Sequence, residues 1–175
     1  MTTAEILKNA NAAKAALAAL SAEEKNKALL AMADALTEDK EAILAANASD
    51  MEKAEAEGRF SRVMLDRLSL NEARIAAMAE GIRAVAELED PVGVLLSHTV
   101  RPNGLEIDKV SVPLGVIAII YESRPNVTSD AAALCLKSGN VCILRGGKEA
   151  YASSHAIASA MRRGLADCAL PMDFV

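Results

Sequence analysis

Apolar residues recur with a helical period through residues 1–90 of the chain. The stretch from about Thr3 to Leu20 is rich in Ala with Lys at intervals, a composition of high helix propensity. Further on, apolar side chains fall on one helical face at Ile75, Met78, Ile82 and Val85. We therefore predict that this part of the chain consists of packed helices.

Two Ser–Glu pairs have the spacing of a capping box, in which a hydroxyl and a carboxylate bond to free N–H groups at a helix start. They are Ser21 with Glu24 and Ser69 with Glu72. Each pair predicts the beginning of a helix. Another helix is expected from near Thr37 to Glu57, before Gly58.

Asp90-Pro91 ends the helical pattern, because proline cannot continue a helix. Beyond it, Leu105 and Ile107 alternate with polar residues, while Val110 and Val112 alternate in the opposite phase. A turn composition at 101–104 separates the extended pieces. We predict an antiparallel hairpin over residues 94–112, with a bulge or bend where the phase slips.

Two continuous apolar runs follow, at 115–120 and 141–144, and a helical segment at 129–137 lies between them. Strands with no polar alternation are typical of parallel sheets covered on both faces. The order strand, helix, strand predicts a βαβ unit, followed by a last helix over 149–170. The expected fold class is α/β, with N-terminal helices (1–90), a hairpin (91–112) and an incomplete parallel, Rossmann-like sheet (113–175).

Polar groups follow both predicted strands, at 121–126 and 145–149. The carboxyl ends of parallel strands share one edge of a sheet, which is where such sheets bind ligands. Gly146 and Gly147 leave backbone N–H groups uncovered between Arg145 and Lys148, so a phosphate is expected there. An ordinary turn with solvated charges is the alternative, since neither GxGxxG nor a Walker A pattern is present.

Composition and charge narrow the class of partner. The net charge is −5, which gives no reason to expect nucleic acid or an anionic membrane. The three cysteines form no CxxC pair, which predicts buried thiols in a reducing, cytoplasmic compartment. The two histidines lie far apart, so no metal site is expected. The many carboxylates between Glu38 and Glu57, Asp50 among them, are expected to form a solvated face paired locally with Lys40 and Lys53.

The segment VPLGVIAIIYESRPNVTSDAAALCLKSGNVCILRGGKEA, residues 112–150, resembles the gamma-glutamyl phosphate reductases of the aldehyde dehydrogenase superfamily. YESRPNVT, CLKSGN and ILRGGKEA carry the resemblance, and LDRLSLNEARI at 65–75 extends it. The resemblance implies an aldehyde dehydrogenase-type fold and NADPH-dependent reduction of L-glutamate 5-phosphate to the 5-semialdehyde in proline biosynthesis. In that reaction a cysteine thiolate displaces phosphate, and hydride reduces the thioester.

The resemblance also implies roles for individual residues. Asn126 is expected to donate a hydrogen bond to the developing oxyanion. Lys148, and next Arg145, are expected to contact the 2′-phosphate of NADPH. The expected cofactor-binding residues are Ser123, Arg124, Arg145, Gly146, Gly147, Lys148 and Glu149.

None of Cys135, Cys142 and Cys168 stands in the family's nucleophile context. The resemblance therefore implies that the chain is an incomplete N-terminal portion, a partial NADP-binding domain without the catalytic domain. It also implies that the full-length enzyme forms a homo-oligomer, with the hairpin as part of an arm. Two alternatives stay open: a related aldehyde dehydrogenase with another substrate, and a non-catalytic interaction module that retains the fold.

Overall fold

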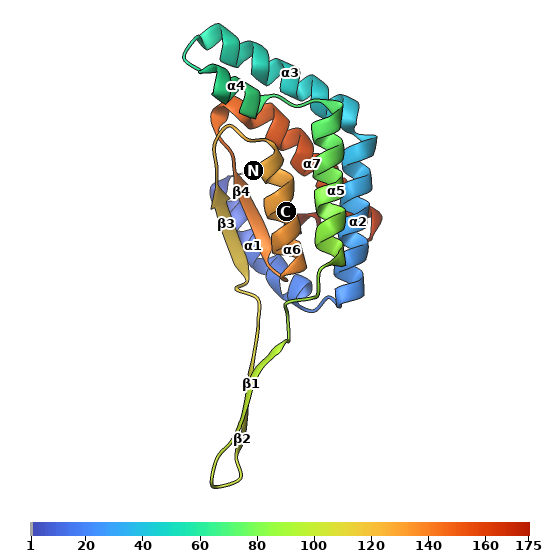
Figure 1. The fold of residues 1–175 in the computed structure, drawn as a ribbon, viewed down its shortest axis with the longest axis vertical. Coiled ribbons are helices and arrows are strands. Elements are labelled where there is room, and N and C mark those ends of the chain that lie inside the picture. The colour runs from blue at the N-terminus through green and yellow to red at the C-terminus, as the bar shows by residue number, and fades with distance from the viewer. Residues whose placement is uncertain (1) are drawn as a thin grey trace.

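A computed structural model describes residues 2–175 (Figure 1). The elements are α1 (Thr3–Ala18), α2 (Ala22–Glu38), α3 (Lys40–Glu57), α4 (Arg62–Leu68), α5 (Glu72–Glu87), β1 (Leu95–Val100), β2 (Glu106–Val110), β3 (Val116–Ile120), α6 (Asn126–Lys137), β4 (Val141–Arg145) and α7 (Tyr151–Asp167), with 3₁₀ turns η1 (Lys148–Ala150) and η2 (Met172–Phe174). Within this range, no helix combines the length and the apolarity needed to cross a membrane.

One of the two predicted capping boxes is present. Ser21 accepts a hydrogen bond from the Glu24 N–H at 3.2 Å, and the Glu24 carboxylate accepts one from the Ser21 N–H at 2.8 Å. The second prediction is wrong, because Asn71 caps α5 by accepting from the Arg74 N–H at 2.8 Å. The Ser69 hydroxyl instead donates to the Asp66 carbonyl at the end of α4, a short helix that the pattern did not predict.

The core forms around α2, which packs against α5 on one side and α7 on the other. Its apolar face is fully buried at Leu29, Met32 and Leu36. On α5, Ile75, Met78 and Ile82 are buried and Val85 packs against them, as the helical period predicted. The α7 face is buried at Ile157, Met161 and Leu165.

Strands β3 and β4 pair in parallel, and α6 connects them in the chain, which confirms the βαβ unit and the α/β class. Helix α1 lies behind this two-stranded sheet and α6 in front of it (Figure 1). The prediction that both strands are covered on both faces is wrong for β3, where Ile120 is 82% exposed. Among residues 2–175, β3 has β4 as its one strand neighbour, so its other edge is open.

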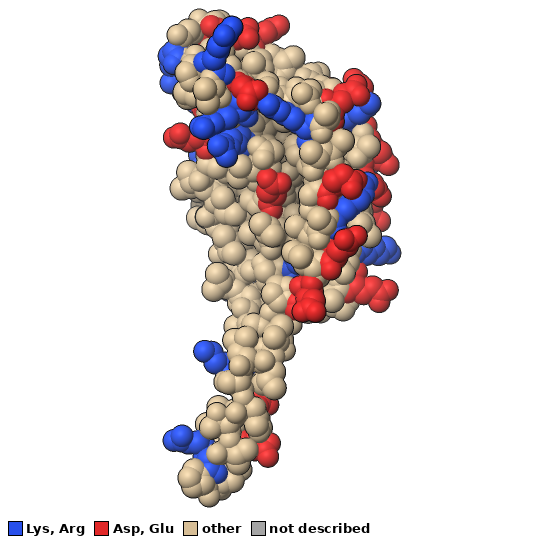
Figure 2. Space-filling view, in the orientation of Figure 1, with Lys and Arg blue, Asp and Glu red and all other residues tan. Residues whose placement is uncertain are grey.

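The predicted hairpin is also present, and β1 and β2 extend away from the helical body (Figure 1). The predicted bulge lies in β1: Leu95 pairs with Val110 and Ser97 with Lys109, so Leu96 is the extra residue. It lies opposite the part of β2 where the apolar alternation changes phase. Every residue of both strands is exposed, and much of the surface between the body and the hairpin tip is uncharged (Figure 2). A two-stranded ribbon of this kind has no core of its own.

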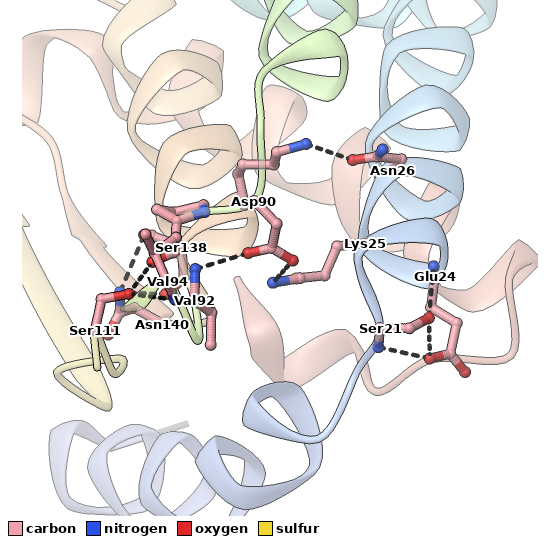
Figure 3. Close-up of polar contacts among 12 residues, drawn as sticks. Ser21, Glu24, Lys25, Asn26, Asp90, Val92, Val94, Ser111, Ser138 and Asn140 are labelled. Carbon is pink, nitrogen blue, oxygen red and sulfur yellow. Dashed lines mark hydrogen bonds and ion pairs between the residues drawn. The ribbon is translucent and has the colours of Figure 1, made fainter. Parts of the chain in front are cut away.

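Polar contacts fix the base of the hairpin (Figure 3). Asp90 forms an ion pair with Lys25 of α2 at 2.5 Å and accepts from the Val92 N–H at 2.9 Å. The Lys25 side chain is only 2% exposed, so Asp90 supplies the counter-charge of a buried ammonium group. Ser111 accepts from the Val94 N–H at 3.0 Å and closes the ribbon beside it.

Candidate functional site

The carboxyl ends of β3 and β4 lie side by side, since Ile120 is paired with Arg145 in the parallel register. The turns that follow are joined by Ser123, whose N–H and hydroxyl donate to the Glu149 carboxylate at 2.9 and 2.7 Å. The predicted convergence of the two strand ends at one edge is therefore confirmed.

Ser123 has the left-handed φ of +44°, a backbone conformation that is strained for a residue other than glycine. Its two bonds to Glu149 hold it there. Burial alone would raise the pKa of Glu149, but the bonds from Ser123 and from its own backbone, with the charge of Arg59, keep that pKa below its usual value. An ionised carboxylate thus joins the two turns.

The N-terminus of α7 is capped by Asp50 of α3. This carboxylate accepts from the Ser153 N–H at 2.8 Å, from the Ser153 hydroxyl at 2.7 Å and from the Ala152 N–H at 3.3 Å. Asp50 is 3% exposed, so its prediction as part of a solvated face is wrong. A carboxylate is favourable at a helix start, where N–H groups lack partners. Because these N–H groups are already bonded, a phosphate beside α7 has to be bound by other groups.

Such groups line a hollow of about 300 Å³ between α3 and the end of β4. Each carboxylate of the lining accepts a hydrogen bond: Asp50 from the start of α7, Glu149 from Ser123 and Glu57 from Arg59. Its three cations have no partner within residues 2–175; they are Lys53, Arg145 and Lys148. The bonds of Asp50 and Glu149 to neutral groups do not cancel their charge, so the three carboxylates balance the three cations, and the neighbouring Arg59 leaves a small positive excess. Because the three cations have no partner, their N–H groups are free to bind an anion.

Arg145 and Lys148 were predicted as a phosphate-binding pair, whereas Lys53 was expected to pair locally with neighbouring carboxylates. No ion pair of Lys53 is present in the described range. Nothing in the spacing of Lys53 distinguishes it from other exposed lysines, because only the packing of α3 beside the β4 end brings it to the hollow.

A second hollow, of about 170 Å³, lies on the other side of the glycine pair, between Tyr121 and α7. A Cβ atom on Gly146 would be 3.2 Å from the Ser154 hydroxyl, and one on Gly147 would overlap the Glu149 carboxylate. Of the buried side-chain polar atoms between residues 2 and 175, the Ser154 hydroxyl alone lacks a hydrogen-bond partner. Protein atoms therefore fill the space that a side chain would take at either glycine, and the unsatisfied Ser154 hydroxyl is the group left to bond a polar ligand.

Asn126 lies in a different place from the turn position expected for it, because α6 begins three residues earlier than predicted and includes it as its first residue. Its amide donates to Asp130 at 3.2 Å, which leaves its second N–H free. Burial raises the pKa of Asp130, against the smaller opposite effect of this bond. Asn126 and Arg124 line a cavity of about 410 Å³ that Arg145 and Lys148 do not reach. The predicted site residues therefore fall into two groups.

Two of the three thiols are buried, as predicted, and the third is not. Cys135 and Cys142 are buried and Cys168 is partly exposed. The hydrogen bond with Cys135, together with burial, raises the pKa of the Cys142 thiol, which keeps it protonated and unreactive. The described residues also contain no group of three or more His, Cys, Asp or Glu side chains that could hold a metal ion.

Charge is unevenly distributed over the surface. Figure 2 shows Lys and Arg gathered at the end of the molecule that carries α4, near the strand ends, while Asp and Glu are spread along α2 and α5. This local basic region occurs in a chain of net charge −5. A binding site for anions at this edge of the sheet is thus compatible with an acidic protein.

An α/β fold with a site at the ends of parallel strands defines a broad class of ligand-binding enzymes. Residues 1–172 match the family model described as "Aldehyde dehydrogenase family", and the chain belongs to this family.

Among curated proteins, the chain is similar to the gamma-glutamyl phosphate reductase of Paramagnetospirillum magneticum. The two are 60% identical over 151 residues, which cover 86% of this chain and 36% of that protein. The chain is also 56% identical over 166 residues to the protein of that name from Streptococcus suis, and the match covers 94% of this chain and 40% of that protein.

Two crystal structures of gamma-glutamyl phosphate reductases have the same fold. The protein from Thermotoga maritima superposes with a TM-score of 0.94 at 44% identity and the one from Saccharomyces cerevisiae with 0.91 at 35%. The match with the Thermotoga protein covers 98% of this chain and 41% of that one. The match with the Saccharomyces protein covers 100% of this chain and 46% of that one. The chain thus spans less than half the length of each of these relatives.

Proposed function

We propose that this chain supplies the cofactor-binding part of an NADPH-dependent reductase that converts L-glutamate 5-phosphate to L-glutamate 5-semialdehyde and phosphate. This reaction is the second step of proline synthesis from glutamate, and we place it in the cytoplasm. The proposal is supported by relatives named gamma-glutamyl phosphate reductase at 56–60% identity. The structural observation that carries it is the hollow with three unpaired cations beside the β4 end.

In this reaction the bound nicotinamide supplies a hydride to the acyl carbon. The bond between that carbon and the phosphate oxygen breaks, and phosphate leaves with the electron pair and takes up one proton. The residues of this chain bind and orient the reactants. Of its three cysteines, Cys135 and Cys142 are buried, and none lines the three hollows described above.

The cations beside β4 discriminate between cofactors. Lys53, Arg145 and Lys148 present positive charge where the 2′-phosphate of NADPH distinguishes it from NADH. The unpartnered Ser154 hydroxyl, in the neighbouring hollow, is available to an adjoining polar group of the dinucleotide.

Asn126 contributes through its free amide N–H, which donates to the carbonyl oxygen as negative charge develops on it. Its bond to Asp130 holds the amide in place. Removal of one such donor typically lowers kcat by about 10²–10³.

The exposed hairpin is the basis for proposing that the full-length protein is a homo-oligomer. Leu95, Leu96, Val100, Ile107 and Val110 are each 46–58% exposed along it. Apolar side chains in such number on a ribbon without a core of its own are suited to cover by a second copy. Sedimentation of a Leu96→Glu, Ile107→Glu variant tests this, with dissociation expected.

The function is tested by steady-state kinetics on the full-length product of the gene with glutamate 5-phosphate. We expect Lys148→Ala and Lys53→Ala each to raise the KM for NADPH about tenfold with little effect on NADH, since a hydrogen bond to a charged group contributes roughly 1.5–3 kcal/mol. Lys8→Ala, an exposed lysine of α1, is the matched control. Equal losses for both cofactors would remove the 2′-phosphate assignment.

A separate measurement tests the amide. We expect Asn126→Ala to lower kcat about 10²-fold while the KM for NADPH stays within about twofold. Unchanged turnover would remove Asn126 from the oxyanion role. Absence of any NADPH oxidation by the wild-type protein would overturn the proposed function itself.

A further inference from the structure

The cavity that contains Asn126 lies between α4, α5 and the start of α6 and has a volume of about 410 Å³. Small-molecule sites typically have about 300–1,000 Å³, so the cavity admits a small polyanion. Its lining includes several charged side chains from three separate elements: Asp66, Arg67, Arg74, Arg124 and Asp130.

Most of these charges already have partners. The Arg74 guanidinium donates to the Asp66 carboxylate at 2.9 Å, and to the carbonyl and hydroxyl of Ser69 at 2.7 and 2.9 Å. Asp130 accepts from Asn126 at 3.2 Å. These contacts make one side of the cavity rigid; the Asp66–Arg74 pair is neutral, whereas Asp130, bonded to a neutral amide, has no cationic partner in the described range.

Arg67 and Arg124 differ from the rest. Neither guanidinium has a hydrogen-bond or ion-pair partner in the part of the chain that the structure describes. They come from α4 and from the turn before α6, 57 residues apart in sequence, and line one cavity. Guanidinium groups bind phosphate oxygens in bidentate geometry, and two of them balance a dianion.

The arrangement with Asn126 narrows the choice of anion. In an acyl phosphate, the carbonyl oxygen and the phosphate are attached to the same carbon, so a donor to one must lie close to the cations that bind the other. Asn126 and the two arginines share a cavity, whereas the cations beside β4 line a different one. The cofactor phosphate therefore has its own set of ligands.

We propose that Arg67 and Arg124 bind the phosphate group of the substrate, and the inorganic phosphate that it becomes. This inference rests on the proposed function, since it identifies the anion from the reaction. Arg74 acts as a positioning residue, because its contacts with Asp66 and Ser69 fix the α4–α5 connection beside Arg67.

The reverse reaction gives a direct measurement, since inorganic phosphate is then a substrate beside the semialdehyde and NADP. With the full-length gene product, we expect Arg67→Gln and Arg124→Gln each to raise the KM for phosphate about tenfold. The KM values for the semialdehyde and NADP should change by less than about twofold. Arg62→Gln is the matched control, because Arg62 lies on α4 but does not line the cavity.

An unchanged phosphate KM in both variants would overturn the inference, and so would an equal rise in Arg62→Gln, which would reflect surface charge alone. A rise confined to the KM for the semialdehyde would also overturn it, because the arginines would then bind the carboxylate of the amino acid.

Equilibrium binding separates this inference from the proposed function. Radiolabelled inorganic phosphate is titrated into the wild-type protein with 2′-AMP present to occupy the hollow beside β4. Binding that is lost in Arg67→Gln and Arg124→Gln but kept in Arg62→Gln supports the phosphate site, even if the wild type shows no turnover. Binding that survives both substitutions overturns it, even if the enzyme is active.

Discussion

Gly164 of α7 lies against the backbone of α2, and replacing it by alanine should destabilise the protein. A Cβ atom at this position would be 2.7 Å from the Ala31 carbonyl oxygen and 2.8 Å from the Met32 Cα atom. Both distances are shorter than real Cβ contacts, and the neighbouring atoms belong to the backbone of a helix. The two helices must therefore move apart to admit the methyl group.

The sign of the effect depends on two opposing terms. Alanine in place of glycine within a helix gains roughly 0.8–1.0 kcal/mol. Overpacking of a close-packed core costs typically about 1–3 kcal/mol, and here it separates α7 from Met32, which is fully buried. Because no flexible side chain can give way, we expect the upper part of that range and a net loss of about 1–2 kcal/mol.

Gly81 of α5 offers the matched control. It is also inside a helix, but it is exposed, and the nearest atom to an added Cβ is Asp130 Oδ1 at 4.0 Å. Gly81→Ala should therefore raise the free energy of unfolding by about 0.5–1 kcal/mol. Urea unfolding followed by circular dichroism measures both. A Gly164→Ala protein as stable as the wild type, or the same sign for both variants, would refute the reasoning.

Three further predictions concern buried charges and thiols. Asp50→Ala should lower the free energy of urea unfolding by about 3 kcal/mol, because it leaves the start of α7 uncapped and unsatisfied. Asp90→Ala should lower it by about 3–5 kcal/mol, because buried Lys25 loses its counter-charge. Burial raises the pKa of Asp90, but the bonds from Lys25 and Val92 and the nearby ammonium charges outweigh it and hold the pKa below its usual 3.8. The stabilisation is thus complete above about pH 4 and is lost as the pH falls through the lower folded pKa. Asp90→Asn should abolish this loss in unfolding curves recorded from about pH 5 down to about pH 2. A thiol reagent should modify Cys168 in the native protein and the two buried thiols only after unfolding, as followed by mass spectrometry.

Local sequence determined most of the secondary structure. The Ser21–Glu24 capping box, the apolar face of α5 and the helix stop at Asp90-Pro91 act within a few residues of the positions they define. The convergence of the β3 and β4 ends was also predictable, because a parallel crossover places both at one edge. The choice between Ser69 and Asn71 as the cap of α5 was not predictable from local sequence. It depends on where α4 ends and on the bonds of the Arg74 side chain to Ser69.

The charged residues show what only the tertiary structure decided. In the sequence, Lys25, Asp50, Lys53 and Arg67 are ordinary charged residues of polar helices. Packing buries Lys25 against Asp90, places Asp50 at the start of α7, and leaves Lys53 and Arg67 in two hollows beside the strand ends. Helical periodicity tells which face of a helix is apolar, but not which distant segment the polar face meets. The partner of a charge depends on contacts between elements far apart in the chain, and these contacts determine the binding sites.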